Sequence, residues 1–399
     1  MASYPRRRLS VCFVNLGLDL GKVYNRISAF HRSILVQEDK MQPPRPRLSW
    51  KTAVFPLLGL LGFFLYIYLF HVDILGILST AKNADPTIYA VAIIFGMLDV
   101  LFFTLSWRVL TNHLSIKISI FRAYLYVWYG IYVDTIVPAQ SISGEVTRTY
   151  LCTRDKCGPF GKVVASLYTH RLMGMALNVV ALIAGIISLN FGGNVNKLVF
   201  NAIIIVAAAI IAIISFMIIL GFKPKWTLKV INVAANLAHK ISMGKIKVEK
   251  LKEEAIEITE HFHDGMVEFR NSPKAISGSL FYLLISWFFS LSVPYLVFIS
   301  LGHPVSISII IITSAIFLAV KAIPIGIPFE VGLPEAVMTT LYISMGIYGP
   351  LAATATILTR IITLWFRFFI GLGAQQYLEL RPAVSSAPNI EKTKINPAL

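Results

Sequence analysis

The feature that most constrains this chain is a series of long apolar stretches interrupted by very few charged residues. A helix needs about 20 residues to cross the roughly 30 Å of hydrocarbon in a bilayer. Five stretches reach that length, and a sixth, at 53–70, is shorter and contains Pro56 but has the composition of a span. The five long stretches are 86–106, 163–190, 198–221, 275–301 and 350–373.

The composition excludes the other common classes of protein. The 399 residues are 56% apolar and 14% charged, whereas a soluble domain has roughly 45–50% apolar and about 25% charged residues. This balance excludes a water-soluble globule, a disordered chain and a collagen-like fibre. Three cysteines are too few for a disulfide framework. The sequence therefore predicts an all-α, polytopic membrane protein.

Two further apolar segments are less regular. Residues 120–137 are rich in aromatics and end at Pro138, and residues 306–323 are followed by Pro324 and Pro328. Each segment is either a full span or a half-helix that enters the membrane and returns to the same side. We expect six full transmembrane helices plus two re-entrant hairpins, or eight spans if the hairpins cross fully.

Basic residues indicate which ends of the spans face the cytoplasm. The net charge is +16, and the basic residues concentrate in 1–52, 107–162 and 222–274. Because basic loops stay inside, we expect both termini in the cytoplasm of a plasma-membrane protein. Residues 1–52 are predicted to be a basic N-terminal extension on anionic headgroups, and 374–399 a cytoplasmic tail. Apolar residues at three- and four-residue steps predict an amphipathic cytoplasmic helix at about 244–270.

An internal repeat divides the predicted membrane domain, residues 53–373, into two copies. In each half a glutamate lies seven residues after a proline and is followed by an arginine inside a span. Glu145 precedes Arg171 by 26 residues, and Glu335 precedes Arg360 by 25 residues. The predicted spans place repeat one at 53–190 and repeat two at 198–373, running through the membrane in opposite senses.

An inverted repeat with broken helices predicts a polar interior site. Non-helical backbone at membrane depth must be buried in protein or line a wet cavity, and transporters place broken helices of inverted repeats around their binding sites. An arginine at the centre of a span costs roughly 2.5–3.5 kcal/mol, so it should face a partner or a cavity. The candidate cavity residues are Gln140, Glu145, Arg148, Arg171, Glu330, Glu335 and Arg360. The residues predicted to set the helix breaks are Pro138, Gly144, Pro328 and Gly332.

The charged sets also have a structural interpretation, in which each glutamate and arginine form an ion pair that locks a repeat. Arg148 is equally well interpreted as a charge at the cytoplasmic face. Asp99 lies within a span, and we expect an arginine or a water as its partner. His170 is expected to be packed or hydrogen-bonded rather than a ligand. His261 and His263 point to different sides of a helix, and no motif for nucleotide or metal binding is recognisable, so we expect no metal and no other cofactor.

Short motifs in the two halves resemble the signatures of the lysylphosphatidylglycerol synthase transmembrane (flippase-like) family. In the first half the matching residues are Trp107-Arg108 (directly after a predicted span), Pro138, Ser143-Gly144-Glu145, Arg148 and His170-Arg171. In the second half they are Gly332, Pro334-Glu335, Arg360 and Gly371. The second motif departs from the family at Phe329-Glu330-Val331, where more glycines are usual.

The resemblance covers roughly 53–373 and implies the lipid-translocating half of a two-part synthase, without its soluble aminoacyl-transferase domain. It implies a flippase-like protein that moves a phospholipid or a polyprenyl-phosphate-linked headgroup between leaflets. The expected partners are membrane lipids with anionic headgroups and a lipid-modifying or glycosyl-transferring enzyme, not nucleic acid. The alternatives are a membrane-embedded transferase acting on a lipid phosphate and a scaffold subunit that transports nothing. No catalytic motif favours an enzyme.

Overall fold

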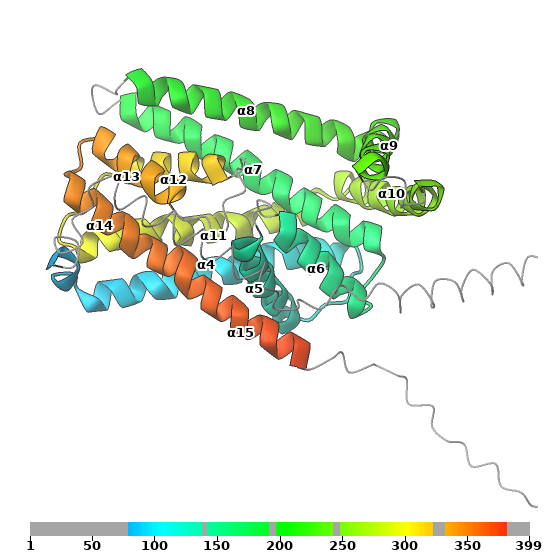
Figure 1. Ribbon diagram of the computed structural model, residues 1–399, viewed down its shortest axis with the longest axis horizontal. Helices are drawn as coiled ribbons and strands as arrows, with labels where there is room; N and C mark the ends of the chain where they lie inside the picture. Colours follow the sequence, from blue (N-terminus) through cyan, green and yellow to red (C-terminus); the bar gives the residue numbers. More distant parts are fainter. Residues whose placement is uncertain (1–78, 138–141, 191–196, 242–247, 322–331, 381–399) are drawn as a thin grey trace, which may run out of the picture. The chain divides into compact units, whose positions relative to one another are not determined.

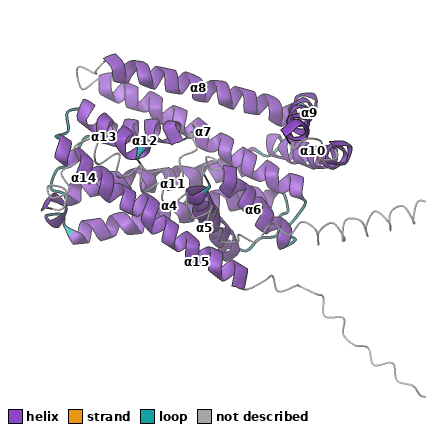
Figure 2. Ribbon diagram, viewed as in Figure 1, coloured by secondary structure: helices purple, strands orange, loops and turns teal. Residues whose placement is uncertain are grey.

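A computed structural model describes five segments of the chain, and every regular element in them is a helix (Figure 2). The predicted first span at 53–70 lies outside the described residues. The described segments are 79–137, 142–190, 197–241, 248–321 and 332–380. The helices are α4 (Pro86–His113), α5 (Ile120–Ile136), α6 (Ile142–Arg154), α7 (Phe160–Asn190), α8 (Lys197–Phe222), α9 (Pro224–Ile241), α10 (Val248–Arg270), α11 (Pro273–Ser300), α12 (Ile307–Lys321), α13 (Leu333–Ser344), α14 (Gly349–Arg360), the π-helical η3 (Ile361–Phe366) and α15 (Arg367–Leu380) (Figure 1).

The all-helical membrane class is confirmed. The described residues contain four helical segments that are long and apolar enough to cross a membrane, and a fifth if a bent pair counts as one span. Large apolar side chains are exposed on these helices, including Ile205 (68%), Phe281 (60%) and Phe288 (60%). Soluble monomers rarely expose such surface, so these side chains are suited to contact lipid tails.

Helix α4 is longer than the sequence predicts. Asp85 caps its first turn, because Oδ1 accepts hydrogen bonds from the N–H groups of Thr87 and Ile88. The helix continues to His113, so the predicted end at 106 is too early. Trp107 therefore lies inside the helix rather than after it, fully buried, with its indole N–H donated to the Ser166 hydroxyl at 3.1 Å.

Helices α4 and α11 form the most extensive contact between any two described helices, and they run antiparallel. Near the start of α4, the Asp85 N–H donates to the carbonyl of Ser300 at the end of α11. Near the end of α4, the Ser106 hydroxyl donates 2.8 Å to the carbonyl of Ser279, close to the start of α11. The hydrogen bond from Ser286 to Asp99 lies between these two contacts. Residues later in α4 thus contact residues earlier in α11, as antiparallel packing requires.

The two halves of the described chain repeat the same arrangement of helices. Helices α4, α5, α6 and α7 correspond in order to α11, α12, α13 and α14. The contacts of α4 with α5, α5 with α6, α6 with α7 and α4 with α7 all have counterparts in the second half. The contacts between halves match as well, since α5 packs on α15 and α12 packs on α7. With α4 and α11 antiparallel, these are the contacts expected of inverted repeats.

Two large apolar cores hold the helices together. One core gathers Trp107, Tyr126 and Leu151 of the first half against Phe262 and Met266 of α10, and it also includes residues of α11 and α15. A second core joins residues of α11, α12, α13 and α14 with one residue of α4, and Phe298 lies edge-on to Tyr342 at 5.0 Å. Burial of such side chains contributes about 1.5–3 kcal/mol each. The cores therefore stabilise both the helices of each repeat and the contact between the repeats.

The entry helices α5 and α12 have 17 and 15 residues, fewer than the roughly 20 that a span requires. Each is followed by a second short helix, α6 with 13 residues and α13 with 12 residues. These lengths favour the hairpin interpretation over two further full spans. The predicted break residues Pro138 and Pro328 lie outside the described residues.

Helix α9 is not predicted by the sequence, which indicates only one amphipathic helix in 222–274. The predicted one is present as α10 (Val248–Arg270). Before it, the chain bends by 105° between Ala207–Phe222 and Pro224–Val233, so α9 runs nearly perpendicular to α8. Helix α9 exposes apolar side chains on one face beside lysines and has no acidic residue. The exposed residues are Lys225, Trp226, Lys229, Val230 and Val233.

We expect α9 to lie flat in the headgroup region, because an exposed tryptophan beside lysines is typical of a membrane interface. The difference in tryptophan fluorescence between wild type and Trp226→Phe isolates this side chain. In proteoliposomes, lipids brominated near the headgroup should quench that difference more strongly than lipids brominated near the chain ends. Stronger quenching by the deep bromines, or none by either, would contradict this placement.

Candidate functional site

The predicted pair in repeat one is formed between α6 and α7. Arg171 Nη1 donates to Glu145 Oε2 at 3.0 Å, and the two side chains are 27% and 23% exposed. Glu145 lies in the first turn of α6, where the helix dipole favours a negative charge. The start of α6, directly after the break, thus carries an ion pair that is partly exposed.

The predicted pair in repeat two is formed between α13 and α14 and is almost fully buried. Arg360 Nε donates to Glu335 Oε1 at 2.6 Å, and the side chains are only 5% and 3% exposed. The other carboxylate oxygen accepts the N–H of Gly332 at 2.6 Å and completes the start of α13. Gly332 has φ +98°, a conformation that glycine adopts readily and other residues avoid. This pair holds the turn, the short helix and the span together.

A third buried pair joins Asp99 on α4 to Arg367 on α15. Arg367 Nη2 donates to Asp99 Oδ2 at 2.6 Å, and Ser286 of α11 donates to Oδ1 at 2.6 Å. The expectation of an arginine partner for Asp99 is confirmed. The sequence analysis did not single out Arg367, although it also lies inside the last predicted span.

The π-helical segment η3 separates the two arginines of the last span. Seven residues make nearly two α-helical turns, so Arg360 and Arg367 would share one face of a regular helix. The wider turns of Ile361–Phe366 direct Arg360 to α13 and Arg367 to α4. Such π segments occur often at functional sites. Here the segment lets one span serve two ion pairs.

Arg148 is buried, with only 7% of the residue exposed. Its Nε donates weakly to the Gly144 carbonyl at 3.4 Å. Among the described residues its Nη1 has no hydrogen-bond partner. The guanidinium lies over the rings of Phe103 and Trp107, at 5.7 and 5.4 Å from their centroids, a contact that stabilises a cation.

Gly144 and Asp134 fix the start of α6 against α5. Asp134 Oδ1 accepts hydrogen bonds of 2.6 Å from the Ser143 hydroxyl and from the Gly144 N–H. A Cβ atom at position 144 would lie 2.2 Å from Asp134 Oδ2 and 2.8 Å from the carbonyl of Gly130, so the close approach requires glycine. Asp134 is a site residue that was not predicted from the sequence. The candidate cavity residues Gln140 and Glu330 lie outside the described residues.

His170 is packed as predicted. Its Nε2 lies 3.1 Å from the Ser106 hydroxyl, and its ring meets Phe103 edge-on at 4.5 Å. In the described part of the chain, no three His, Cys, Asp or Glu side chains are grouped to hold a metal ion.

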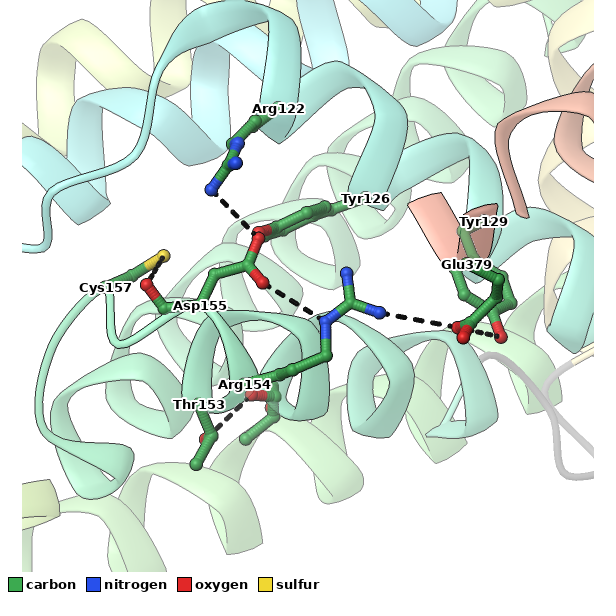
Figure 3. Close-up of polar contacts among 9 residues, drawn as sticks. Arg122, Tyr126, Tyr129, Thr153, Arg154, Asp155, Cys157 and Glu379 are labelled. Carbon is green, nitrogen blue, oxygen red and sulfur yellow. Dashed lines mark hydrogen bonds and ion pairs between the residues drawn. The ribbon is translucent and has the colours of Figure 1, made fainter. Parts of the chain in front are cut away.

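A separate polar cluster lies where α6 ends, with Asp155 at its centre (Figure 3). The Asp155 side chain is 2% exposed and accepts hydrogen bonds from Arg122 and Arg154, each at 3.1 Å, and from the Tyr126 hydroxyl. Arg154 also reaches Glu379 of α15 at 3.5 Å. The cluster therefore ties α5, α6 and α15 together.

Two thiols lie beside this cluster. Cys152 and Cys157 are both buried and unbridged, and the Cys157 N–H donates to the Cys152 carbonyl at 2.9 Å where α6 ends. The hydrogen bond from the Cys152 thiol lowers the pKa of the Cys157 thiol.

Comparison with known proteins identifies the family. The sequence profile described as "lysylphosphatidylglycerol synthase TM region" matches residues 53–371. The chain belongs to this family. A UPF0104 membrane protein of Pyrococcus horikoshii is 23% identical over 74% of this chain and 89% of its own length. A UPF0104 membrane protein of Methanothermobacter thermautotrophicus is 19% identical over 74% of this chain and 87% of its own length.

The range matched by the family covers the three charged pairs Glu145–Arg171, Glu335–Arg360 and Asp99–Arg367. Helix α15, however, continues to Leu380, beyond the matched range and beyond the predicted end of the membrane domain at residue 373. The extension carries Glu379, which contacts the Asp155 cluster.

Loss of the buried Glu335–Arg360 pair should reduce the stability of the protein more than loss of the partly exposed Glu145–Arg171 pair. Glu335→Gln keeps an acceptor for Gly332 but removes the carboxylate that accepts from Arg360 Nε, which should destabilise the fold by about 3–5 kcal/mol. Glu145→Gln is the matched control, with a smaller expected loss because its pair is only partly buried. Thermal unfolding in detergent measures both. Equal losses of stability in the two variants would contradict the conclusion that the buried Glu335–Arg360 pair stabilises the fold more strongly.

Removing the charge of Asp155 should loosen the junction of α5, α6 and α15. Asp155→Asn leaves two arginines without their shared carboxylate, and we expect a loss of about 1.5–3 kcal/mol, as for hydrogen bonds to a charged group. Asp264, exposed on α10, provides the control Asp264→Asn. An unfolding midpoint for Asp155→Asn equal to that of the control would show that the cluster does not stabilise this junction.

Proposed function

We propose that this protein moves an anionic lipid headgroup between the two leaflets, namely the phosphate of a phospholipid or of a polyprenyl-phosphate carrier. The observation that carries the proposal is the partly exposed Glu145–Arg171 pair at a helix break, with a second guanidinium on the next turn of α6. Guanidinium groups bind phosphate through two parallel hydrogen bonds. Charged groups at membrane depth are by default candidates for a substrate path.

The difference in exposure between the two pairs supports a division of roles. The pair in repeat one is about one quarter exposed, whereas the pair in repeat two is almost fully buried. A ligand phosphate can reach Arg171 without first separating a fully buried ion pair. In this proposal Arg171 binds the headgroup, while Glu335 and Arg360 hold repeat two rigid.

The inverted arrangement supports a movement between leaflets. In transporters built from inverted repeats, one half rocks against the other around a site at the repeat interface. The contacts of α5 with α15 and of α7 with α12 are such interfaces, since each joins the two halves. In this proposal the protein lies in the plasma membrane with both termini in the cytoplasm, and an enzyme that modifies lipids or transfers sugars is a fitting partner.

Lipid translocation by proteoliposomes tests the proposal. Fluorescently labelled phosphatidylglycerol is reconstituted with the protein, and dithionite bleaches the label that reaches the outer leaflet. Arg171→Ala should slow this movement about 10- to 100-fold, the loss expected for hydrogen bonds to a charged group. Arg270→Ala, at an exposed position on α10, is the matched control and should move lipid like wild type.

Two results would contradict the proposal. A translocation rate for Arg171→Ala equal to wild type would show that this guanidinium does not bind the headgroup. If Arg360→Ala also left the rate unchanged, the buried pairs would be structural and the protein a membrane scaffold.

A further inference from the structure

The two repeats differ at the position three residues after the glutamate. In α6 this residue is Arg148, and in α13 it is Met338. Both side chains are buried, with 7% and 5% exposure. One repeat therefore holds a buried cation where the other holds a shorter, uncharged side chain.

The buried cation has an unused donor. Within the described residues, Nη1 of Arg148 has no hydrogen-bond partner, and a buried donor without a partner costs about 1–3 kcal/mol. The nearby carboxylate of Asp134 is engaged by the Ser143 hydroxyl and the Gly144 N–H. The Nη1 group of Arg148 is therefore available to donate a hydrogen bond to a carboxylate or a phosphate.

Binding of an anion at Arg171 creates a need for such a donor. An incoming phosphate competes with Glu145 for the guanidinium, and the displaced carboxylate would lose its partner in a poorly solvated site, which is costly. Arg148 follows Glu145 by three residues, and side chains at that spacing share one face of a helix. Glu145 can thus turn from Arg171 to Arg148 without a change in the backbone of α6.

We propose that Glu145 exchanges its arginine partner when the headgroup binds. In the present state Glu145 pairs with Arg171, and Arg148 rests against Phe103 and Trp107. In the bound state the headgroup phosphate takes Arg171, and Glu145 pairs with Arg148. This inference rests on the proposed function and adds that the phosphate binds in repeat one.

Repeat two cannot make the same exchange. Met338 offers no charge, and both oxygens of Glu335 are already engaged, one by Arg360 and one by the N–H of Gly332. Release of Glu335 would also open the turn that begins α13. Met338 is the natural residue at the equivalent position of repeat two. Arg148→Met is therefore the substitution that tests the exchange in repeat one.

The first experiment is Arg148→Met, measured by translocation of labelled phosphatidylglycerol in phosphatidylcholine vesicles. Without its second partner Glu145 remains on Arg171, so the rate should fall about 10- to 100-fold. A normal rate for Arg148→Met together with a loss for Arg171→Ala would overturn the exchange and leave the proposed function intact. Normal rates for both variants would overturn the proposed function itself.

The second experiment separates exchange from a structural role of Arg148. In the double variant Glu145→Gln/Arg148→Met, no carboxylate has to be displaced, so the rate should recover to within about threefold of Glu145→Gln alone. If the double variant is as slow as Arg148→Met while both fold normally, Arg148 does not act through Glu145 and the proposal fails. Arg148→Gln replaces the Met variant in the same comparison if that variant does not fold.

Discussion

The antiparallel packing of α4 against α11 is the contact on which the rest of the structure depends. Contacts near both ends of the two helices and one near their middle, from Ser286 to Asp99, fix the direction of this packing. Since α4 and α11 begin equivalent sets of helices, their opposite directions make the two halves inverted copies. Each hairpin packs on the last helix of the other half, α5 on α15 and α12 on α7.

Arg171, Arg360 and Arg367 lie on helices that are apolar and long enough to span a membrane, where lipid solvates a guanidinium poorly and it needs a partner. Each of the three pairs with a carboxylate, whereas Arg148 lies over two aromatic rings. Among these four arginines, the departure of Arg148 from pairing marks the half that is suited to bind an anion. The ion pairs therefore have two roles. The more deeply buried pairs stabilise the fold, and in the partly exposed pair Glu145 can exchange its partner.

Much of this arrangement could be predicted from the sequence, since length and apolarity define spans and matched spacing joins Glu145 to Arg171 and Glu335 to Arg360. Other features depend on three-dimensional packing. The role of Arg367 depends on the π-helical turns before it, which no α-helical periodicity predicts. Helix α9 was missed because its lysines resemble those of a solvated loop. Asp155 gains its role only where α5, α6 and α15 meet.

The inverted orientation of the two halves is the central claim, and side-specific labelling tests it most directly. Asn112 and His303 are exposed at the corresponding ends of α4 and α11. Each is replaced by cysteine in a background without the three native cysteines, and sealed vesicles are treated with a membrane-impermeant maleimide. If the two halves are inverted, the two positions react from opposite sides of the membrane. Reaction of both from the same side would contradict the inverted orientation.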